Sequence, residues 1–268
     1  MTERPLPRAR KRFGQHFLEP AWVAKLIASL HASQDDTFLE IGPGRGALTK
    51  PLAPLVGHLV AVEIDRDLAA ALPAHVPPNV RVVEGDFLKV DLTDLLRHET
   101  LPVRVVGNLP YNVSSPILFK LLHAAGHGRV LRDATLMLQK EVAERLVASP
   151  GSSDYGVLAI QVALLADVER VLTLPPGAFR PPPKVTSAVV RLRFHPPIAD
   201  VGDQPTFERL VRGVFLQRRK TLANALKPVA DAAHRSASEV IAQSGLDPSR
   251  RPETLTIEEF ARLSRAVL

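Results

Sequence analysis

The chain contains no cysteine among its 268 residues. This absence excludes disulfide bonds, thiolate nucleophiles and cysteine-ligated zinc, so the chemistry of the protein must use other residue types. No apolar stretch is long enough to span a bilayer, and the basic N-terminus runs into Phe13-Gly14-Gln15-His16 instead of the apolar core of a signal peptide. We therefore expect a cytoplasmic protein. His123 and His127 lie four residues apart without a third ligand nearby, so we expect no metal site.

The composition predicts a packed protein with a modest positive charge. At 46% hydrophobic residues the chain is far from the composition of a disordered protein, and its length suits one substantial domain plus a smaller one. The formal net charge is +6. Positive charge is concentrated at the start of the chain, in Arg4, Arg8, Arg10, Lys11 and Arg12. This arm indicates either a polyanionic partner or a solvated tail, and charge alone does not distinguish them.

Short β-branched runs alternate with helical stretches through the first two-thirds of the chain. This alternation predicts an α/β fold with a parallel sheet and helices on both faces. The expected strands are Thr37–Ile41, His58–Ile64, Val80–Glu84, Val103–Gly107 and Thr135–Gln139, followed by two late strands at Val168–Thr173 and Ser187–Phe194. The expected helices are Pro20–Leu30, Ala47–Leu55, Arg66–Leu72, Ser115–Ala124, Lys140–Ala148 and Gly156–Ala166.

The character of the chain changes after His195-Pro196-Pro197, where helical spacing continues without any strand run. We predict a catalytic domain over residues 1–198, including the basic arm, and a small all-helical domain over residues 199–268 that contacts nucleic acid. The helices expected in this second domain are Phe207–Leu216, Lys220–Leu226, Ser238–Gln243 and Ile257–Val267. A domain of this size gains stability by leaning on a larger neighbour.

A glycine-rich turn and two acids follow the first three predicted strands. Gly42 and Gly44 let a ligand approach the backbone closely, Glu63 can hold both hydroxyls of a ribose, and Asp86 can accept a hydrogen bond from an adenine amino group. The turn lacks the Gly-x-Gly-x-x-Gly spacing that places pyrophosphate on a helix, which favours a nucleoside sulfonium cofactor over a dinucleotide. A purely structural turn with surface acids is the alternative.

The fourth predicted strand ends in Gly107-Asn108-Leu109-Pro110-Tyr111-Asn112. An exocyclic amine on adenine is a poor nucleophile because its lone pair is conjugated with the ring, so it needs hydrogen-bond acceptors that favour tetrahedral nitrogen. The Asn108 side chain and the backbone carbonyls of Leu109 and Pro110 can provide these acceptors. Tyr111 offers a face for stacking a base. The alternative is a purely structural Asn-Pro turn with a core tyrosine. That alternative does not explain why the motif lies at a strand end, as the acids Glu63 and Asp86 do.

With these motifs the chain resembles the KsgA-type ribosomal RNA adenine dimethyltransferases, a family of Rossmann-like class I methyltransferases. The resemblance spans nearly the whole chain. Its motifs are Phe13-Gly14-Gln15-His16-Phe17-Leu18, Glu40-Ile41-Gly42-Pro43-Gly44-Arg45-Gly46, Val62-Glu63-Ile64-Asp65, Glu84-Gly85-Asp86, Asn108-Leu109-Pro110-Tyr111-Asn112 and Phe179-Arg180-Pro181-Pro182-Pro183-Lys184-Val185. The resemblance implies S-adenosylmethionine as the cofactor.

The resemblance also implies a role for each motif residue. His16 and Leu18 would close over the cofactor, and Gly42 would pass beneath its methionine part. Glu63 would hold the ribose, Asp86 would recognise the adenine, and Asn108 would stand between cofactor and target base. Phe179 would stack on the target adenine opposite Tyr111; the alternative is that Phe179 is a hydrophobic plug in a proline-rich loop.

The substrate implied by this resemblance is small-subunit ribosomal RNA within a pre-ribosomal particle. Two successive methyl transfers to each of two neighbouring adenosines in a hairpin near its 3′ end would occur during ribosome assembly. Independently of the resemblance, we expect a monomer. A target base must leave its stack to reach the sheet edge, which costs less in a loop than in a duplex. The basic run Gln217-Arg218-Arg219-Lys220 would then track phosphates, or it is a solvated helix face.

Three other functions are alternatives to methylation of small-subunit RNA. A large-subunit methyltransferase that confers antibiotic resistance shares many of these motifs, although the stretch Phe179–Val185 favours the small-subunit enzymes. A DNA adenine methyltransferase would need a sequence-reading domain, and none is evident. A non-enzymatic assembly factor would show degraded catalytic motifs, whereas those present here are intact.

Overall fold

The computed structural model describes residues 17–126 and 130–268. Contacts between residues divide the chain into two compact units. The sheet unit comprises the described residues up to Ala143 together with Asp167–Phe194, and the helical unit comprises Glu144–Ala166 and His195–Leu268. Within the described residues, no helix has both the length and the apolar character needed to cross a membrane.

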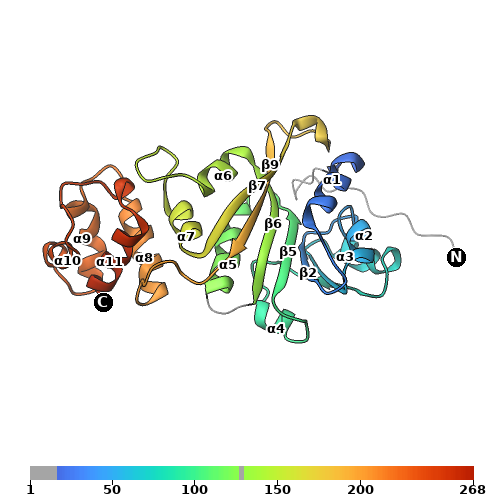
Figure 1. Ribbon diagram of the computed structural model, residues 1–268, viewed down its shortest axis with the longest axis horizontal. Helices are drawn as coiled ribbons and strands as arrows, with labels where there is room; N and C mark the ends of the chain where they lie inside the picture. The colour runs from blue at the N-terminus through green and yellow to red at the C-terminus, as the bar shows by residue number, and fades with distance from the viewer. Residues whose placement is uncertain (1–16, 127–129) are drawn as a thin grey trace. The chain divides into compact units, whose positions relative to one another are not determined.

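A seven-stranded sheet in the order β4-β3-β2-β5-β6-β9-β7 forms the centre of the sheet unit (Figure 1). The strands are β2 (Thr37–Ile41), β3 (His58–Glu63), β4 (Val80–Glu84), β5 (Val103–Asn108), β6 (Leu131–Gln139), β7 (Ala166–Leu174) and β9 (Ser187–Phe194). Strands β2 to β6 pair in parallel, whereas β9 runs antiparallel to β6. The predicted α/β class is confirmed, and the antiparallel strand makes the sheet a mixed one.

Helices cover both faces of this sheet, as the alternating pattern predicted. They are α1 (Pro20–Leu30), α2 (Thr49–Leu52), α3 (Arg66–Ala71), α4 (Leu92–Leu96), α5 (Ser114–Gly126) and α6 (Lys140–Leu146). Helices α1, α2 and α3 lie on one side of the sheet and α5 lies on the other (Figure 1). Local chemistry starts two of them, because Asp65 accepts a hydrogen bond from the Asp67 amide at the start of α3, and Asp91 caps α4 in the same way.

Two very short strands were not predicted from the sequence. Strand β1 (Phe17–Leu18) pairs antiparallel with β8 (Phe179–Arg180), so that Leu18 lies opposite Phe179. Two residues are too few to show the period-two alternation by which a strand is recognised, and the partners are far apart in the chain. This pair brings the early and the late family-like motifs together.

The register of the parallel strands brings their carboxyl ends to one edge of the sheet. Ile41 lies opposite both Val62 and Gly107, Glu63 lies opposite Glu84, and Asn108 lies opposite Met137. Ligands of open α/β sheets bind along this edge, in the crevice outside the strand ends. The turn after β2 and the ends of β3, β4 and β5 therefore meet where a site is expected.

The opposite edge of the sheet is held by a buried ion network. Arg104, only 4% exposed, donates from Nε to both carboxylate oxygens of Asp133 at 3.2 and 3.0 Å and from Nη1 to Asp36 at 2.9 Å. Its Nη2 donates to the Leu30 carbonyl oxygen at 2.8 Å. These partners are carboxylates and a carbonyl, so the buried guanidinium is compensated. The network joins the end of α1 to the first residues of β5 and β6.

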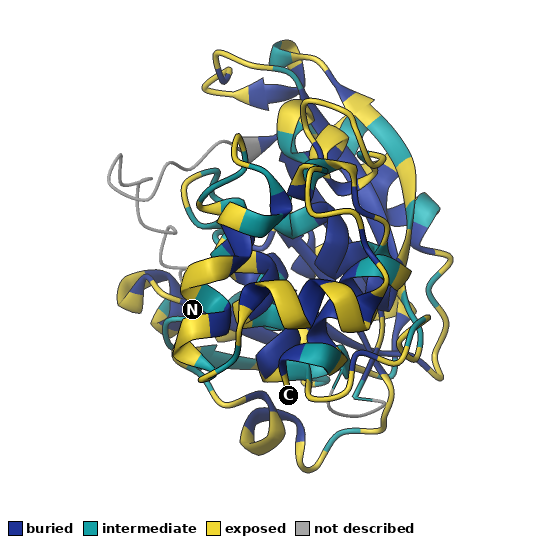
Figure 2. Ribbon diagram, turned by 90° about the vertical axis from the view of Figure 1, so that its left-hand side faces the viewer, coloured by how far each residue is buried: buried dark blue, intermediate teal, exposed yellow. Residues whose placement is uncertain are grey.

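The core follows from the apolar strands. Every residue of β2 is buried, and the dark central strands in Figure 2 contrast with the yellow outward faces of helices and loops. The largest fully buried side chains of the sheet unit include Phe38, Leu39, Leu59 and Leu118. Glu40 is the one acid inside β2, and its burial is considered below with the site.

The helical unit contains α7 (Val157–Leu165), α8 (Gln204–Phe215), α9 (Leu222–Ala232), α10 (Ala237–Ser244) and α11 (Ile257–Val267). This division of the chain differs from the predicted domains 1–198 and 199–268, because the segment Glu144–Ala166 groups with the C-terminal helices. Helix α7 is apolar on nearly all sides and therefore needs cover on every side. Tyr155, just before α7, donates a hydrogen bond to the Leu255 carbonyl oxygen at 2.8 Å, which adds a polar tie inside this unit.

A close approach of α8 and α9 leads to a testable prediction. A Cβ on Gly213 would lie 2.3 Å from Cγ2 of Val229, and a β-branched valine has little rotamer freedom to move away. We expect Gly213→Ala to lower the free energy of unfolding by about 1–2 kcal/mol, although alanine is the better helix former. Urea unfolding of the full chain measures this change.

The control for this prediction is the same glycine substitution in a background that already carries Val229→Ala. Removing the valine methyl groups removes the clash, so the glycine substitution is then expected to be neutral or stabilising. A stabilising effect of Gly213→Ala in the wild-type background would show that the two helices are free to separate.

Candidate active site

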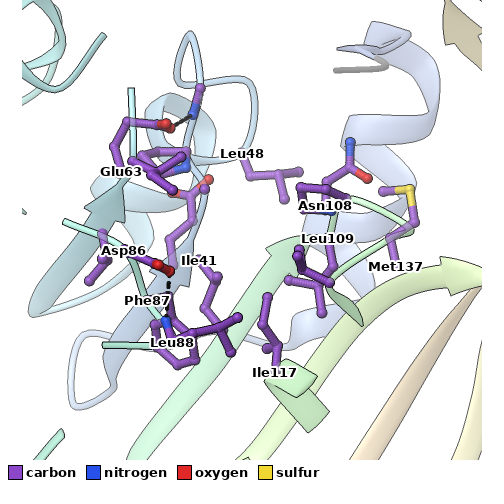
Figure 3. Close-up of a pocket in the computed structure, with 18 of the residues that line it drawn as sticks. Ile41, Leu48, Glu63, Asp86, Phe87, Leu88, Asn108, Leu109, Ile117 and Met137 are labelled. Atoms are coloured by element: carbon purple, nitrogen blue, oxygen red, sulfur yellow. Dashed lines mark hydrogen bonds between the residues drawn. The ribbon is translucent and has the colours of Figure 1, made fainter. Parts of the chain in front are cut away.

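A cavity of about 300 Å³ lies at the carboxyl edge of the sheet, a volume within the range of small-molecule sites. The glycine-rich turn after β2 and the end of β3 line one part of it, and the loops after β4 and β5 line another, together with Leu18, Ile117 and Met137. Glu63 and Asp86 lie on one side, and Asn108, Leu109 and Met137 lie on the other (Figure 3). The cavity therefore has an acidic side and a side formed by the Asn108 loop.

The glycine-rich turn leaves open space beside its backbone. Gly42 and Gly44 have φ angles of +70° and +57°, in the left-handed region that favours glycine, and no atom lies within 4 Å of a Cβ built on either. The Gly42 amide donates to the Val62 carbonyl oxygen at 2.9 Å, which ties the turn to β3. A side chain at either glycine would be strained and would occupy space that a ligand can use.

Glu63 is held rigidly at the end of β3. The side chain is 3% exposed, and its two oxygens accept hydrogen bonds from the backbone amides of Gly44 and Asp65, both at 2.8 Å. Burial raises the pKa of Glu63 above its usual value, and these amides offset part of that rise. Each carboxylate oxygen keeps a second lone pair, so Glu63 can also accept hydrogen bonds from two neighbouring hydroxyls.

Asp86 begins the loop after β4, and its Oδ1 accepts a hydrogen bond from the Leu88 amide at 3.0 Å (Figure 3). Lys120 of α5 holds the same loop. Its Nζ donates to the carbonyl oxygens of Phe87, at 2.7 Å, and Val90, and lies 5.2 Å from the centre of the Phe87 ring. Burial lowers the pKa of Lys120, while Asp91 and Asp86 oppose that change. Nothing in the local sequence marks Lys120 for this task.

Glu40 is a second acid at this cavity to which sequence reasoning gave no role. It lies within β2, is 1% exposed and lines the cavity, and its Oε2 has no hydrogen-bond partner among the described residues. Burial raises the pKa of Glu40 to about 7, and the negative charge of Glu63 adds to the rise. The signal in the sequence is an acid inside the otherwise apolar run from Phe38 to Ile41.

The Asn108 loop is fixed by hydrogen bonds to its backbone. The Leu109 amide donates to the Met137 carbonyl oxygen at 3.4 Å, and the Pro110 carbonyl oxygen accepts from the Val113 amide at 3.1 Å. Asn108, Leu109, Pro110 and Tyr111 all line the cavity. The Pro110 carbonyl already has one partner, so its second lone pair is the one left for a ligand.

The three remaining predicted site residues differ in where they lie. Leu18 lines the cavity, whereas Phe179 is 2% exposed, packs in the hydrophobic core with Ala178 and Val189, and is not among the residues that line this cavity. This packing agrees with the interpretation of Phe179 as a plug, and its stacking role stays a prediction. His16 lies outside the described residues.

The basic run of the helical unit has mixed surroundings. Arg218 donates from Nε to Glu253 at 2.5 Å and from Nη2 to the Ser153 carbonyl oxygen at 2.8 Å, so it serves the fold of this unit. Arg219 and Lys220 are exposed, and the neighbouring Leu216 is 87% exposed. A role of this run in tracking phosphates stays a prediction.

Comparison with known proteins decides the family. The family model described as ribosomal RNA adenine dimethylase matches residues 7–266. The chain belongs to this family. Its sequence is 47% identical over 262 residues to ribosomal RNA small subunit methyltransferase A of Nitrosococcus oceani, with 96% of each chain covered. It is 46% identical to the protein of that name from Geobacter metallireducens, covering 97% of this chain and 96% of the relative.

Two solved structures agree with this assignment. A dimethyladenosine transferase from Plasmodium falciparum superposes with a TM-score of 0.74 at 27% identity, covering 92% of this chain and 96% of that one. The 23S rRNA methyltransferase ErmE superposes with a TM-score of 0.63 at 26% identity, covering 94% and 99%. The fold of this ribosomal RNA adenine dimethylase family member is that of the class I methyltransferases, as predicted.

S-adenosylmethionine is the cofactor of this enzyme class, and the cavity residues suit it. The molecule carries a positively charged sulfonium and an ammonium group, and the cavity contains Glu63, Asp86 and Glu40. The buried Glu40 oxygen without a partner fits a cationic ligand, since a buried carboxylate is stabilised by an opposite charge. The open space beside Gly42 and Gly44 fits a ligand that passes close to the backbone.

The loop held by Lys120 leads to a second prediction. Lys120→Met keeps an apolar stem but removes the donors to the Phe87 and Val90 carbonyls, so the loop that carries Asp86 loses its anchor. We expect the affinity for S-adenosylhomocysteine to fall about tenfold, the equivalent of about 1.4 kcal/mol. The affinity for S-ribosylhomocysteine, which lacks the adenine, is expected to change much less. Isothermal titration calorimetry measures both affinities.

Lys89→Met is the matched control, because Lys89 is an exposed lysine of the same loop. It is expected to leave both affinities unchanged. Equal losses for the two ligands in Lys120→Met would mean that Lys120 supports the whole cavity and not the adenine side of it.

Proposed function

We propose that the chain transfers methyl groups from S-adenosylmethionine to the exocyclic amino group of adenosines in small-subunit ribosomal RNA. The observation that carries this proposal is that Asn108, Leu109, Pro110 and Tyr111 line the same cavity as Glu63 and Asp86. A target amine at the Asn108 loop would therefore share one cavity with a nucleoside cofactor. The names of the relatives support small-subunit RNA as the substrate class.

When bound, S-adenosylmethionine supplies a methyl group on a positively charged sulfur, which makes that carbon electrophilic. The task of this chain is to prepare the amine nitrogen. The adenine amine has two N–H donors, so two of the three candidate carbonyls, the Asn108 side chain and the Leu109 and Pro110 backbone, accept from it at a time, which draws its lone pair out of conjugation. After the first methylation one N–H is left to donate to one of them. No strong general base is needed, because the nitrogen loses its proton to water after methylation.

The acids on the other side of the cavity bind and orient. Glu63, pinned by the amides of Gly44 and Asp65, holds the ribose hydroxyls, and Asp86 accepts from the adenine amino group. Leu18 and Met137 exclude water from the cavity. His16 completes the cofactor site in this proposal on the strength of the family resemblance.

The finer substrate belongs to the same proposal. The family resemblance suggests two neighbouring adenosines in a hairpin near the 3′ end of the RNA, each dimethylated within a pre-ribosomal small subunit. The names of the relatives support small-subunit RNA, and the lower cost of unstacking a base in a loop supports a hairpin. Tyr111 provides one stacking face for the flipped base. Phe179 would provide the other only if it left the core position described above. The enzyme acts as a cytoplasmic monomer.

Transfer of tritiated methyl groups to immature small subunits tests the proposal. We expect incorporation that maps to adenosine, and mass spectrometry of ribosomal RNA from cells with and without the gene should show two dimethylated neighbours. Binding of the cofactor without modification of any RNA, at any salt concentration or assembly state, would refute the catalytic claim. Modification of large-subunit RNA alone would assign the chain to the activity named for ErmE.

A further inference from the structure

Tyr111 and Ser187 are joined by a hydrogen bond across the end of the sheet. The phenol oxygen of Tyr111 lies 2.8 Å from Oγ of Ser187, a residue 76 positions further along the chain. Tyr111 belongs to the loop after β5, and Ser187 is the first residue of β9. Neither the Asn108 motif nor the late proline-rich motif contains Ser187, so the contact is visible only in the structure.

Backbone pairing with β6 holds Ser187 in place. It lies opposite Gln139 in the β6–β9 ladder, and the preceding residue, Thr186, accepts a hydrogen bond from the Lys140 amide at 3.0 Å. Ser187 is fully buried. The backbone of Ser187 is therefore held by the sheet, and its hydroxyl meets the Tyr111 phenol from that position.

The other end of Tyr111 is fixed as well. Its carbonyl oxygen accepts a hydrogen bond from Oγ of Ser114 at 3.1 Å, and the neighbouring Pro110 carbonyl accepts from the Val113 amide. A tyrosine has two side-chain torsions, and anchoring both the backbone and the phenol oxygen leaves the ring one orientation. Tyr111 lines the cavity, so the residue held by these hydrogen bonds borders the space that a target base would enter.

We propose that Ser187 is a positioning residue that holds the Tyr111 ring in the orientation needed to stack the target adenine. This proposal rests on the proposed function, because it assumes that an adenine enters beside Tyr111. The hydrogen bond removes rotamers of the ring that would have to be lost when RNA binds, so the entropy cost of ordering falls on folding instead of on substrate binding. It also directs the phenol hydroxyl to β9.

Kinetics of three variants test this role. Ser187→Ala removes the hydroxyl, Tyr111→Phe removes its partner while keeping the ring, and the double variant removes both. We expect each single variant to lower kcat/KM for immature small subunits about fivefold, mainly through KM for the RNA, the equivalent of one neutral hydrogen bond of about 1 kcal/mol. The double variant is expected to equal either single variant, because both changes remove the same interaction. Affinity for S-adenosylhomocysteine is expected to stay unchanged.

A spectroscopic measurement follows the contact without using activity. The chain has only two tyrosines, Tyr111 and Tyr155, so protein labelled with ¹³C at tyrosine Cζ gives two resonances. Tyr155 lies in the helical unit and donates to the Leu255 carbonyl. We expect Ser187→Ala to shift the Tyr111 resonance and leave that of Tyr155 in place, with Tyr111→Phe providing the assignment.

Thr135→Val is the matched control. Thr135 is a buried hydroxyl residue of β6 in the same strand pair, where it accepts from Arg191. This variant is expected to leave kcat/KM and both tyrosine resonances near their wild-type values. A fall in kcat/KM equal to that of Ser187→Ala would assign the effect to the β6–β9 pair as a whole.

Besides that outcome of the control, three results would overturn the proposal. These are an unchanged kcat/KM in Ser187→Ala, additive effects in the double variant, or an unchanged Tyr111 resonance. If the wild-type protein methylates no adenosine, the proposed function and the positioning role fail together. If the wild-type protein is active and Ser187→Ala is as active as the wild type, the positioning role fails and the proposed function stands.

Discussion

Replacing Asn108 by alanine should lower the rate of methyl transfer at least about a hundredfold, because a prearranged polar group at a reacting centre is commonly worth that much or more. Asn108 lines the cavity at the end of β5, where its side-chain carbonyl is proposed to accept from the target amine. Alanine keeps the strand end but offers no acceptor. We expect the effect in kcat, measured in single turnovers with tritiated methyl donor and immature small subunits.

Two comparisons make the Asn108 result specific. Asn112→Ala changes an exposed asparagine at the rim of the same cavity and is expected to cost less than tenfold in kcat. The affinity of Asn108→Ala for S-adenosylhomocysteine is expected to fall tenfold at most, so a loss of kcat at saturating cofactor reports on chemistry. Cells that carry Asn108→Ala and keep every cellular function of the gene would favour a non-enzymatic assembly role.

Replacing Glu40 by glutamine should stabilise the cofactor-free protein at pH 8 by up to about 3 kcal/mol and leave its stability unchanged below about pH 4.5. Burial raises the pKa of Glu40 to about 7 in the folded protein, from an ordinary value of 4.5. A difference of about 2.5 units corresponds to about 3 kcal/mol, taken as an upper bound. Glutamine has nearly the same shape and no charge, so it removes this penalty.

The sign of this effect follows from proton binding. Below pH 4.5 Glu40 is protonated in both states and costs nothing. Between pH 4.5 and 7 the unfolded chain ionises first, so stability falls as pH rises, and above pH 7 the buried carboxylate keeps a constant penalty. Titrating groups that do not interact with Glu40 cancel in the difference, and the coupling to Glu63 is part of the measured effect. Urea unfolding at pH 4.5, 6, 7 and 8 measures it, and parallel pH profiles for the two proteins would show that Glu40 is not buried as described.

The same substitution separates stability from binding. A negative charge on Glu40 attracts a cationic cofactor more strongly in a buried cavity than in water. At pH 8 we expect Glu40→Gln to weaken S-adenosylmethionine binding about tenfold and to weaken binding of the less positively charged S-adenosylhomocysteine by a smaller factor. Equal losses for the two ligands would indicate a change of cavity shape and not of charge. A more stable protein that binds its cofactor less well identifies Glu40 as an acid retained for function.

Much of the sheet unit could be predicted from local sequence alone. Strands Thr37–Ile41, Val80–Glu84 and Ser187–Phe194 have the predicted bounds, because each is a short apolar or β-branched run ended by a turn, a proline or an acid. The cavity residues at the carboxyl ends of parallel strands were also predictable in position. Parallel strands align their carboxyl ends, so residues such as Glu63 and Asn108 must reach the same edge.

The tertiary structure alone decided which residues distant in the chain contact one another. The sequence determined the α/β class, the motifs and their strand-end placement, because strand and turn preferences act within a few residues. It did not determine the antiparallel direction of β9, the burial of Glu40, the Lys120 anchor or the Tyr111–Ser187 contact. Each of these depends on which segments pack together, and side chains that meet only after folding leave no pattern in the residues around them.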